Sequence, residues 1–261
     1  MTLADAKQRF SNRVADYVRY RPGYPPALME LLRAECGLRA EHGVADIGSG
    51  TGLLSEMFLR NGNFVWGVEP NREMSDAAVE FLAAYPNFES VSGAAEATTL
   101  ADGCADFVTA AQAFHWFEPT AARREFLRIL KPNGWVAVMW NDRRISETAF
   151  GRAYEDLLVR YGTDYKRVKE AYPETHQMAN FFGKGNVQRR ELPNFQEFDF
   201  EGLAGRLRSS SYAPNEGHAN YKPMMAALRD LFEVNEKLGR VRMDYTTRIY
   251  FGRLDPARDA G

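Results

Sequence analysis

The chain has 261 residues, of which 45% are hydrophobic, 13% aromatic and 26% charged, the composition of a folded globular protein. Lysine and arginine (33) nearly balance aspartate and glutamate (35), so the net charge of -2 gives no overall attraction to nucleic acid or to an anionic membrane. We expect a cytoplasmic protein with no membrane segment, because the longest apolar run, residues 135–140, is far shorter than the ~20 residues of a membrane helix, and MTLADAKQRF at the start lacks a hydrophobic signal segment.

Two helices are predicted before the first strand, over residues 3–21 and 25–36. The segment that joins them, RPGYP, contains two prolines and a glycine, which break a helix. We interpret residues 1–42 as a helical N-terminal cap.

Residues 43–141 alternate short apolar runs with amphipathic stretches, the pattern of a parallel sheet built from strand-helix-strand units. The predicted strands cover residues 44–47, 64–68, 88–92, 105–111 and 135–140, and the predicted helices cover residues 53–60, 74–84 and 121–130. Proline and glycine in LKPNG, residues 130–134, end the last of these helices. We interpret this part as an α/β cofactor-binding core.

The remainder of the chain is more aromatic and less regular. Helices are predicted over residues 147–161 and 164–172, with a loop over 181–186, so we interpret residues 142–186 as a helical lid inserted into the domain. Residues 187–261 are interpreted as C-terminal strands and a cap segment, and 241–251 alternate apolar and polar residues as a last strand of the same sheet. Because there is no repeat or low-complexity linker, we expect one domain.

A glycine-rich turn follows the first predicted strand, in the sequence VADIGSGTGLL. Gly48, Gly50 and Gly52 let a ligand approach bare main chain, since a Cβ would block it and tight turns often require positive φ. Turns of this kind also occur for purely structural reasons. The turn therefore indicates a nucleotide-like ligand only together with a second feature.

Glu69 supplies the second feature, at the end of the next predicted strand and 23 residues after Asp46. A carboxylate there accepts hydrogen bonds from both hydroxyls of a ribose, each worth ~1.5–3 kcal/mol when water is excluded. The alternative is a solvated acid at a strand end. The glycine turn upstream favours the ribose.

The spacing of the turn separates two nucleotide ligands. A dinucleotide site has G-x-G-x-x-G with pyrophosphate at the helix N-terminus, whereas here Asp46 lies two residues before Gly48. An acid at that place repels phosphate and suits a ligand with an ammonium or sulfonium charge. That description fits S-adenosylmethionine and opposes a nicotinamide-dependent oxidoreductase, the rival enzyme class.

The motif D-x-G-x-G-x-G at residues 46–52 resembles that of the class I S-adenosylmethionine-dependent methyltransferases. Over roughly residues 10–142 the chain is most similar to the type 11 methyltransferases and the trans-aconitate methyltransferase-like proteins, through YRPGYP, GVEPNREM, SGAAEATTL, AFHWF and LRILKPNGWVAV. The resemblance implies a Rossmann-like α/β fold with a seven-stranded, mostly parallel sheet whose last strand is antiparallel, a helical N-terminal cap and an inserted lid. It also implies S-adenosylmethionine as cofactor, S-adenosylhomocysteine as product, and a turn site of Asp46, Gly48, Ser49, Gly50, Thr51 and Gly52.

The resemblance places the adenosine next to Glu69, Pro70 and the segment SGAAEATTL. The Ala95 backbone and the Glu96 side chain are expected to contact the base edge, and Met74 is expected either on the adenine face or only in the core. Many relatives carry Asp where this chain has Ala94, so a contact to the 6-amino group falls to Glu96 or to backbone atoms.

Around the reacting methyl group, the resemblance places Gln112 near the methionine part and His115 and Trp116 near the acceptor. His115 titrates near neutrality, so it takes a proton from a hydroxyl or thiol acceptor, or else only hydrogen-bonds the crevice wall. Trp116 is expected to be a wall. Arg21 is expected either to hold the cofactor carboxylate with its guanidinium fork or to lie on the surface at a helix end.

The acceptor is expected to be a small molecule, with Tyr24 and Tyr212 lining its pocket. The chain lacks the Asn-Pro-Pro-aromatic turn of methyltransferases that act on nucleobase amines. Cys104 precedes the fourth strand, away from the cofactor, and with Cys36 it forms no C-x-x-C metal motif and permits one disulfide at most.

Two chemistries for the acceptor remain open. A carboxylate is already ionised and needs no base, whereas an alcohol or phenol does. We favour O-methylation of one of these groups. The alternative from another class is a protein that binds S-adenosylmethionine without turnover, and the sequence predicts no oligomeric state.

Overall fold

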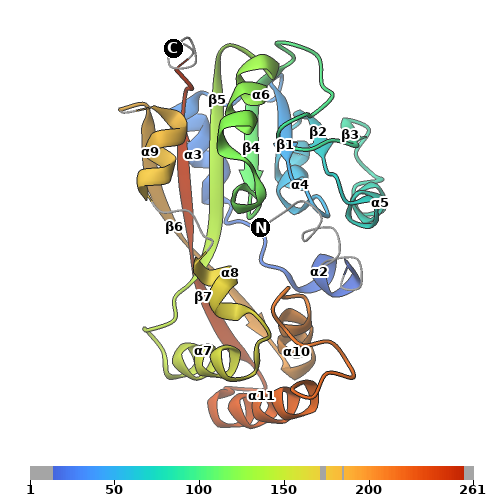
Figure 1. Cartoon of the computed structure of the whole chain (residues 1–261), viewed down its shortest axis with the longest axis vertical. Coiled ribbons are helices and arrows are strands. Elements are labelled where there is room, and N and C mark those ends of the chain that lie inside the picture. Colours follow the sequence, from blue (N-terminus) through green and yellow to red (C-terminus); the bar gives the residue numbers. More distant parts are fainter. Residues whose placement is uncertain (1–13, 171–174, 184, 256–261) are drawn as a thin grey trace.

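The fold is a single mixed sheet, given by a computed structural model that describes residues 14–170, 175–183 and 185–255 (Figure 1). The strands are β1 (Gly43–Ile47), β2 (Phe64–Val68), β3 (Phe88–Val91), β4 (Ala105–Ala111), β5 (Leu130–Arg143), β6 (Val187–Phe198) and β7 (Val241–Gly252). They lie in the order β3-β2-β1-β4-β5-β7-β6. Strands β1 to β5 are parallel, and β7 runs antiparallel to both β5 and β6. This confirms the expected Rossmann-like α/β sheet with an antiparallel last strand.

Helices cover both faces of the sheet. In chain order they are α3 (Ala27–Cys36), α4 (Leu53–Arg60), α5 (Arg72–Phe81), α6 (Pro119–Ile129) and α9 (Thr175–Phe182). Phe58 of α4 packs in one cluster with Phe107, while Phe126 of α6 packs in another with Val108. Because successive strand residues point to opposite faces, β4 contributes to both cores. No helix of the described ranges is both long and apolar enough to cross a membrane.

Three strands continue beyond this layered part. Strand β5 has 14 residues and β6 and β7 have 12 each, and in Figure 1 they run down to α7 (Ala149–Tyr161), α10 (Phe200–Arg208) and α11 (Tyr221–Asn235). The short helices α2 (Val14–Tyr20) and α8 (Tyr165–Glu170) lie at the junction (Figure 1). Leu158, Leu203, Leu228 and Met243 are buried there together in a hydrophobic core separate from the two around the sheet. The C-terminal half of the chain therefore builds a second body on the long strands.

Several element boundaries differ from the sequence prediction. The strand predicted over 135–140 begins at Leu130 and ends at Arg143, so the segment 130–134, predicted as a helix stop, lies within β5. Helix α9 includes Phe182, where a loop was predicted, and it packs beside α6 rather than with α7. Of the helix predicted over 3–21 only α2 falls in the described chain, and residues 171–172 of another lie outside it. The division into cap, core, lid and C-terminal segment stays a prediction.

The second core generates a stability prediction. Leu158 is fully buried in α7, with 0% of its surface exposed, whereas the adjacent Val159 is 47% exposed. Leu158→Ala should lower the free energy of unfolding by about 2–5 kcal/mol, because it leaves a cavity among packed side chains. Val159→Ala is the matched control and should change it by less than about 1 kcal/mol. Urea denaturation measures the free energy of unfolding of both variants. Equal decreases for the two would contradict a tightly packed second core.

Candidate functional site

The glycine turn between β1 and α4 has the backbone conformation that its sequence predicted. Gly48, Gly50 and Gly52 have φ values of 67°, 57° and 85°, all in the left-handed region. A Cβ on Gly48 or Gly52 would lie 2.6 Å from a neighbouring side chain, but a Cβ on Gly50 would meet only Met74, at 3.6 Å. Gly48 and Gly52 therefore serve the packing of the chain itself, and Gly50 is the position where main chain faces open space.

Glu69 joins this turn to the end of β2. Its Oε2 accepts a hydrogen bond from the Gly50 N–H at 2.9 Å, and its Oε1 accepts one from the Asn71 N–H at 2.9 Å. The N–H groups of Gly48 and Ser49 donate to the Val68 carbonyl oxygen at 2.8 and 3.2 Å. The turn is thus tied to β2 by both main chain and carboxylate. A carboxylate has about four lone-pair sites, so Glu69 can also accept bonds from a ligand.

Asp46 is a buried acid at the end of β1, with 1% of its surface exposed. Its Oδ2 accepts from the Ser55 hydroxyl at 2.7 Å and its Oδ1 from the Thr109 hydroxyl at 3.0 Å. Burial raises the pKa of Asp46 to about 6, although these hydrogen bonds act in the opposite direction. No cationic side chain in the described part of the chain pairs with it. A buried carboxylate of this kind favours a cationic ligand nearby.

A cleft opens at the carboxyl ends of β1 and β4, where open α/β sheets bind ligands. About 460 Å³ of it is not filled by protein atoms, part of which is open to solvent, and it is lined by Arg21, Pro22, Tyr24, Asp46, Gly48, Ser49, Gly50, Thr51, Leu53, Leu54, Ala111 and Gln112. The Thr51 hydroxyl is buried and has no hydrogen-bond partner among the described residues. The cleft thus brings together most of the turn residues with Arg21, Tyr24 and Gln112, and their roles toward a ligand stay predictions.

Gln112 lines the cleft in a strained conformation. It is a non-glycine residue with a φ of 57°, and such outliers gather at functional sites. Its Nε2 donates to the Asn141 carbonyl oxygen at 3.3 Å. Asn141 lies near the C-terminal end of β5. Its side chain also donates to the Gly23 carbonyl oxygen and accepts from the Thr247 hydroxyl at 2.6 Å. Asn141 was not among the predicted site residues, although a polar residue directly after an apolar run was a usable signal.

His115 lies in the short 3-10 helix η2 (Phe114–Trp116) that follows Gln112. Its ring centroid is 5.0 Å from that of Trp116. Burial lowers the pKa of His115 to about 4, and the charge of Arg21 acts in the same direction. The expectation that His115 titrates near neutrality is therefore wrong. At neutral pH its imidazole is uncharged and is a weak base.

The residues predicted around the base are not among those that line the cleft. Met74 is buried beside Gly50, and Pro70 follows Glu69 in a half-buried position. Ala95 is buried, and one oxygen of Glu96 accepts a hydrogen bond from the Glu118 N–H at 2.7 Å. Their contacts to a bound adenine stay predictions.

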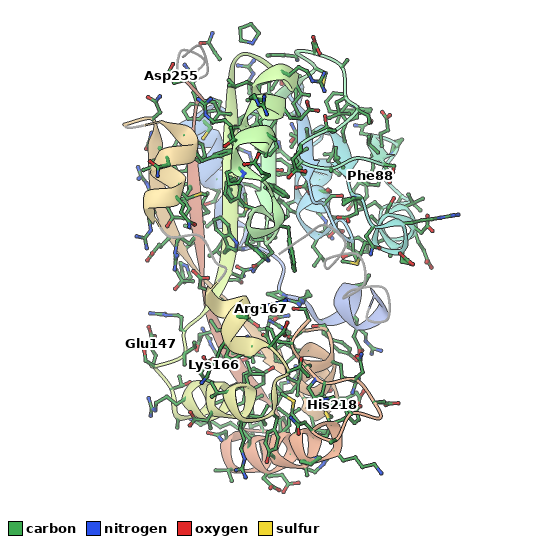
Figure 2. The ribbon with its side chains drawn as sticks, in the orientation of Figure 1. Phe88, Glu147, Lys166, Arg167, His218 and Asp255 are labelled. Carbon is green, nitrogen blue, oxygen red and sulfur yellow. The ribbon has the colours of Figure 1, made fainter. Side chains whose placement is uncertain are left out.

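Of the two tyrosines predicted for the acceptor pocket, Tyr24 lines the cleft and Tyr212 does not. The Arg21 Nη2 donates to the Ser209 carbonyl oxygen at 2.8 Å, which links the cleft to the end of α10. Tyr212 lies in the second core, where its hydroxyl accepts from the Arg143 Nη1 at 2.7 Å. His218, which follows Tyr212 in the chain, is exposed on the second body (Figure 2) and is not among the residues that line the cleft.

The two cysteines are free thiols. Cys36 is buried, which raises the pKa of its thiol to about 12, and Cys104 is half-buried. Within the described ranges no three His, Cys, Asp or Glu side chains are grouped as metal ligands.

Comparison with known proteins adds to this geometry. Residues 45–138 match the family model of the type 11 methyltransferase domain. The uncharacterized methyltransferase Rv3342 of Mycobacterium tuberculosis H37Rv is 37% identical over 139 residues, which are 53% of this chain and 54% of that protein. An uncharacterized methyltransferase of Schizosaccharomyces pombe, C25B8.09, is 34% identical over 51% of this chain and 53% of its own length. The matched part spans about half the length of these curated relatives.

Solved structures share the fold over more of the chain. A candidate type II methyltransferase from Anaeromyxobacter dehalogenans superposes with a TM-score of 0.65 at 22% identity, over 90% of this chain and 98% of that one. A candidate methyltransferase from an antibiotic biosynthesis pathway of Anabaena variabilis gives a TM-score of 0.62 at 19% identity, over 91% and 100%. At these identities the likeness shows the fold.

The burial of Asp46 generates a prediction on pH. Its folded-state pKa of about 6 lies above the unfolded value, so the folded protein is relatively stabilised below about pH 4 and loses that stability as the pH rises through about 6. Asp46→Asn has no charge to bury. Its free energy of unfolding relative to the natural chain should therefore rise by up to about 3 kcal/mol between about pH 4 and 7, measured by urea denaturation.

Asp106 provides the control of opposite sign. Burial raises its pKa, but the hydrogen bonds from Lys131 and the Gly43 N–H outweigh this and lower it. Asp106→Asn should therefore lose stability relative to the natural chain as the pH rises. The account of Asp46 fails if the two variants show the same trend, or if Asp46→Asn shows none.

Proposed function

We propose that this chain, in which residues 45–138 match a methyltransferase domain, is a class I methyltransferase that transfers a methyl group from S-adenosylmethionine to a small-molecule acceptor. The observation that supports this most is the attachment of the left-handed glycine turn to Glu69 by the 2.9 Å bond from the Gly50 N–H. The Glu69 carboxylate is thus bonded to Gly50, which lines the cleft, and this supports an adenosine ligand.

The residues present fit the adenosine part of that cofactor. Glu69 would accept the ribose hydroxyls, since hydroxyls are donors and a carboxylate only accepts. Gly50 would leave room for the sugar, because only Met74 lies near the place of its missing Cβ. Pro70, Met74, Ala95 and Glu96 would flank the base.

The charges fit the methionine part. Asp46 is buried without a cationic partner in the described chain, so a sulfonium and an ammonium group nearby would stabilise its charged form. Arg21 lines the same cleft and would bind the carboxylate, while Gln112 would position the methyl-bearing end. A phosphate would be repelled by Asp46, which disfavours a dinucleotide.

When bound, S-adenosylmethionine supplies an electrophilic methyl group, and its transfer forms a carbon–oxygen bond on the acceptor as the sulfur–carbon bond breaks, leaving S-adenosylhomocysteine. The protein has to align the acceptor oxygen with the methyl group and to exclude water, which together can contribute ~7–11 kcal/mol. Tyr24, His115 and Trp116 would form the acceptor side of this arrangement. Because His115 is a weak base at a pKa of about 4, O-methylation of an already ionised carboxylate is favoured over that of a hydroxyl.

The finer expectations about context belong to the same proposal. The enzyme would act in the cytoplasm on a free small molecule. The net charge of -2 supports an acceptor other than nucleic acid, because it provides no general attraction to phosphate backbones.

Ligand binding tests the proposal. S-adenosylmethionine and S-adenosylhomocysteine should each raise the melting temperature, since a ligand selective for the folded state must do so, whereas NADH should not. Glu69→Gln should weaken S-adenosylhomocysteine binding about 10- to 100-fold, the value of one or two charged hydrogen bonds. Isothermal titration calorimetry measures this, with the exposed Glu73→Gln in α5 as control.

The result that would contradict it is equally concrete. If neither adenosyl ligand changes the melting temperature at millimolar concentration, the cleft does not bind the cofactor. If both bind and no small carboxylate, phenol or alcohol accepts a methyl group in a mass-spectrometric screen, the protein is a binder without turnover.

Substitution of His115 separates the two acceptor chemistries. His115→Asn should lower kcat by less than about 10-fold with a carboxylate acceptor, because no proton has to be removed. A loss of about 100-fold or more, with an unchanged dissociation constant for S-adenosylhomocysteine, would instead show that His115 takes a proton from a hydroxyl.

A further inference from the structure

A buried group of charged and phenolic side chains lies in the second core, near the ends of β5 and α10. We call it the arginine–tyrosine cluster, and it consists of Arg143, Tyr154, Glu155, Tyr165, Arg206 and Tyr212. Arg143 donates to the hydroxyls of Tyr212 and Tyr165, both at 2.7 Å, and its Nη2 lies 3.4 Å from Glu155 Oε2. The charge of Arg143 is therefore matched by a carboxylate.

Arg206, by contrast, has no carboxylate partner among the described residues. It is only 4% exposed, and its guanidinium donates to two neutral groups, the Tyr245 hydroxyl at 3.3 Å and the Ser210 hydroxyl at 2.9 Å. Among the described residues no carboxylate pairs with it. Its place in the last turn of α10 offers only the partial negative charge of a helix end. A buried cation without an anion is costly, so one positive charge in the cluster remains to be neutralised.

Tyr154 supplies a second, independent observation. Its ring lies 5.6 Å from the Arg143 guanidinium carbon, and it is 2% exposed. Its hydroxyl has no hydrogen-bond partner in the described chain, although buried hydroxyls are normally bonded. The charges of Arg206 and Arg143 both act on this phenol. A missing acceptor for Tyr154 and a missing anion for Arg206 thus occur in the same cluster.

Tyr212 reports on the electrostatic field of the cluster. Burial alone would raise the pKa of its phenol, but Arg143, Arg206 and Arg21 outweigh burial and lower it. The three arginines therefore favour negative charge at this point. In its protonated form the Tyr212 phenol carries no charge that offsets these arginines.

The cluster adjoins the acceptor side of the cleft. Arg21 lines the cleft and donates to the Ser209 carbonyl oxygen, one residue before the Ser210 that contacts Arg206. Its charge acts on both His115 and Tyr212. Arg143 follows two residues after Asn141, which accepts a hydrogen bond from Gln112 of the cleft wall. Arg21 therefore connects the cleft to the chain segment next to the cluster.

We propose that the arginine–tyrosine cluster binds a carboxylate of the methyl acceptor, with Arg206 as its cation and the Tyr154 hydroxyl as a further donor. The proposal rests on the methyl-transfer function and adds the group by which the acceptor is held. A single unmatched positive charge calls for a monoanion, so a carboxylate fits better than a doubly charged phosphate.

Calorimetric titration with simple probes tests this, both with and without S-adenosylhomocysteine. Formate, acetate and benzoate are compared with formamide, acetamide and benzamide, which have similar shapes and no charge. A carboxylate should bind and its amide should not. Arg206→Met should weaken carboxylate binding about 30-fold or more, and Tyr154→Phe about 10-fold.

Stability distinguishes this role from a structural one. Removing an unmatched buried charge or an unbonded hydroxyl should leave the melting temperature of Arg206→Met and Tyr154→Phe equal to or above that of the natural chain. Arg208→Met, which removes a paired arginine from the same helix, is the control and should bind the probes normally.

Two results would overturn the proposal: no carboxylate binding better than its amide, or carboxylate binding that survives Arg206→Met while that variant melts at a lower temperature. Both variants should keep their affinity for S-adenosylhomocysteine. Failure of the natural chain to bind that ligand would count against the methyl-transfer function alone, since the carboxylate titration is also done without it.

Discussion

The carboxylate of Glu69 holds two turns together, and the ligand site depends on that attachment. One turn follows β1 and the other follows β2, and both must stay in place for main chain to face the cleft. The bonds from the Gly50 and Asn71 N–H groups provide this, at 2.9 Å each. Left-handed φ values at the three glycines are the local condition for it, because other residues reach that conformation only at a cost.

The same constraint explains why charges are arranged as they are. A turn built from N–H groups at a helix N-terminus would attract phosphate, and the buried Asp46 reverses this preference. The cleft is therefore suited to a nucleoside that carries positive charge. Arg21 lines the cleft and donates to the Ser209 carbonyl oxygen at the end of α10, and its charge acts on the neutral imidazole of His115.

In the proposed function, the second body forms the side of the site that holds the methyl acceptor. Strands β5 and β7 extend from the layered part of the sheet into the second body. Arg143, the last residue of β5, therefore lies in the second core. There α10 adds Arg206 and the loop after it adds Tyr212. A buried arginine is costly in a hydrophobic core unless an anion offsets its charge. The proposed carboxylate site rests on this cost.

Most of the sheet could be predicted from the sequence, because its strands are short apolar runs. The strands at Phe64–Val68 and Ala105–Ala111 and the helix at Leu53–Arg60 have the predicted bounds. Strand β6 was not assigned bounds, since an exposed edge strand with Pro193 and many charged residues has no apolar face to recognise. Helices α10 and α11 were likewise missed in a stretch interpreted only as a cap.

The site divides in the same way. The turn, Glu69 and Gln112 follow strand ends, and local sequence is enough to find such positions. The lowered pKa of His115 and the grouping of Arg206 with Tyr154 depend on burial and on residues far apart in the chain, so no local pattern reveals them. Asn141 stands between these cases, since it follows an apolar run but acts through contacts to four other segments.

The most direct test is a crystal structure of the complex with S-adenosylhomocysteine, at a resolution that places the ribose hydroxyls. The account predicts that both hydroxyls bond to the Glu69 carboxylate and that the sugar lies against the main chain at Gly50. An adenosyl group bound elsewhere, or a ribose that leaves Glu69 bonded only to Gly50 and Asn71, would contradict it.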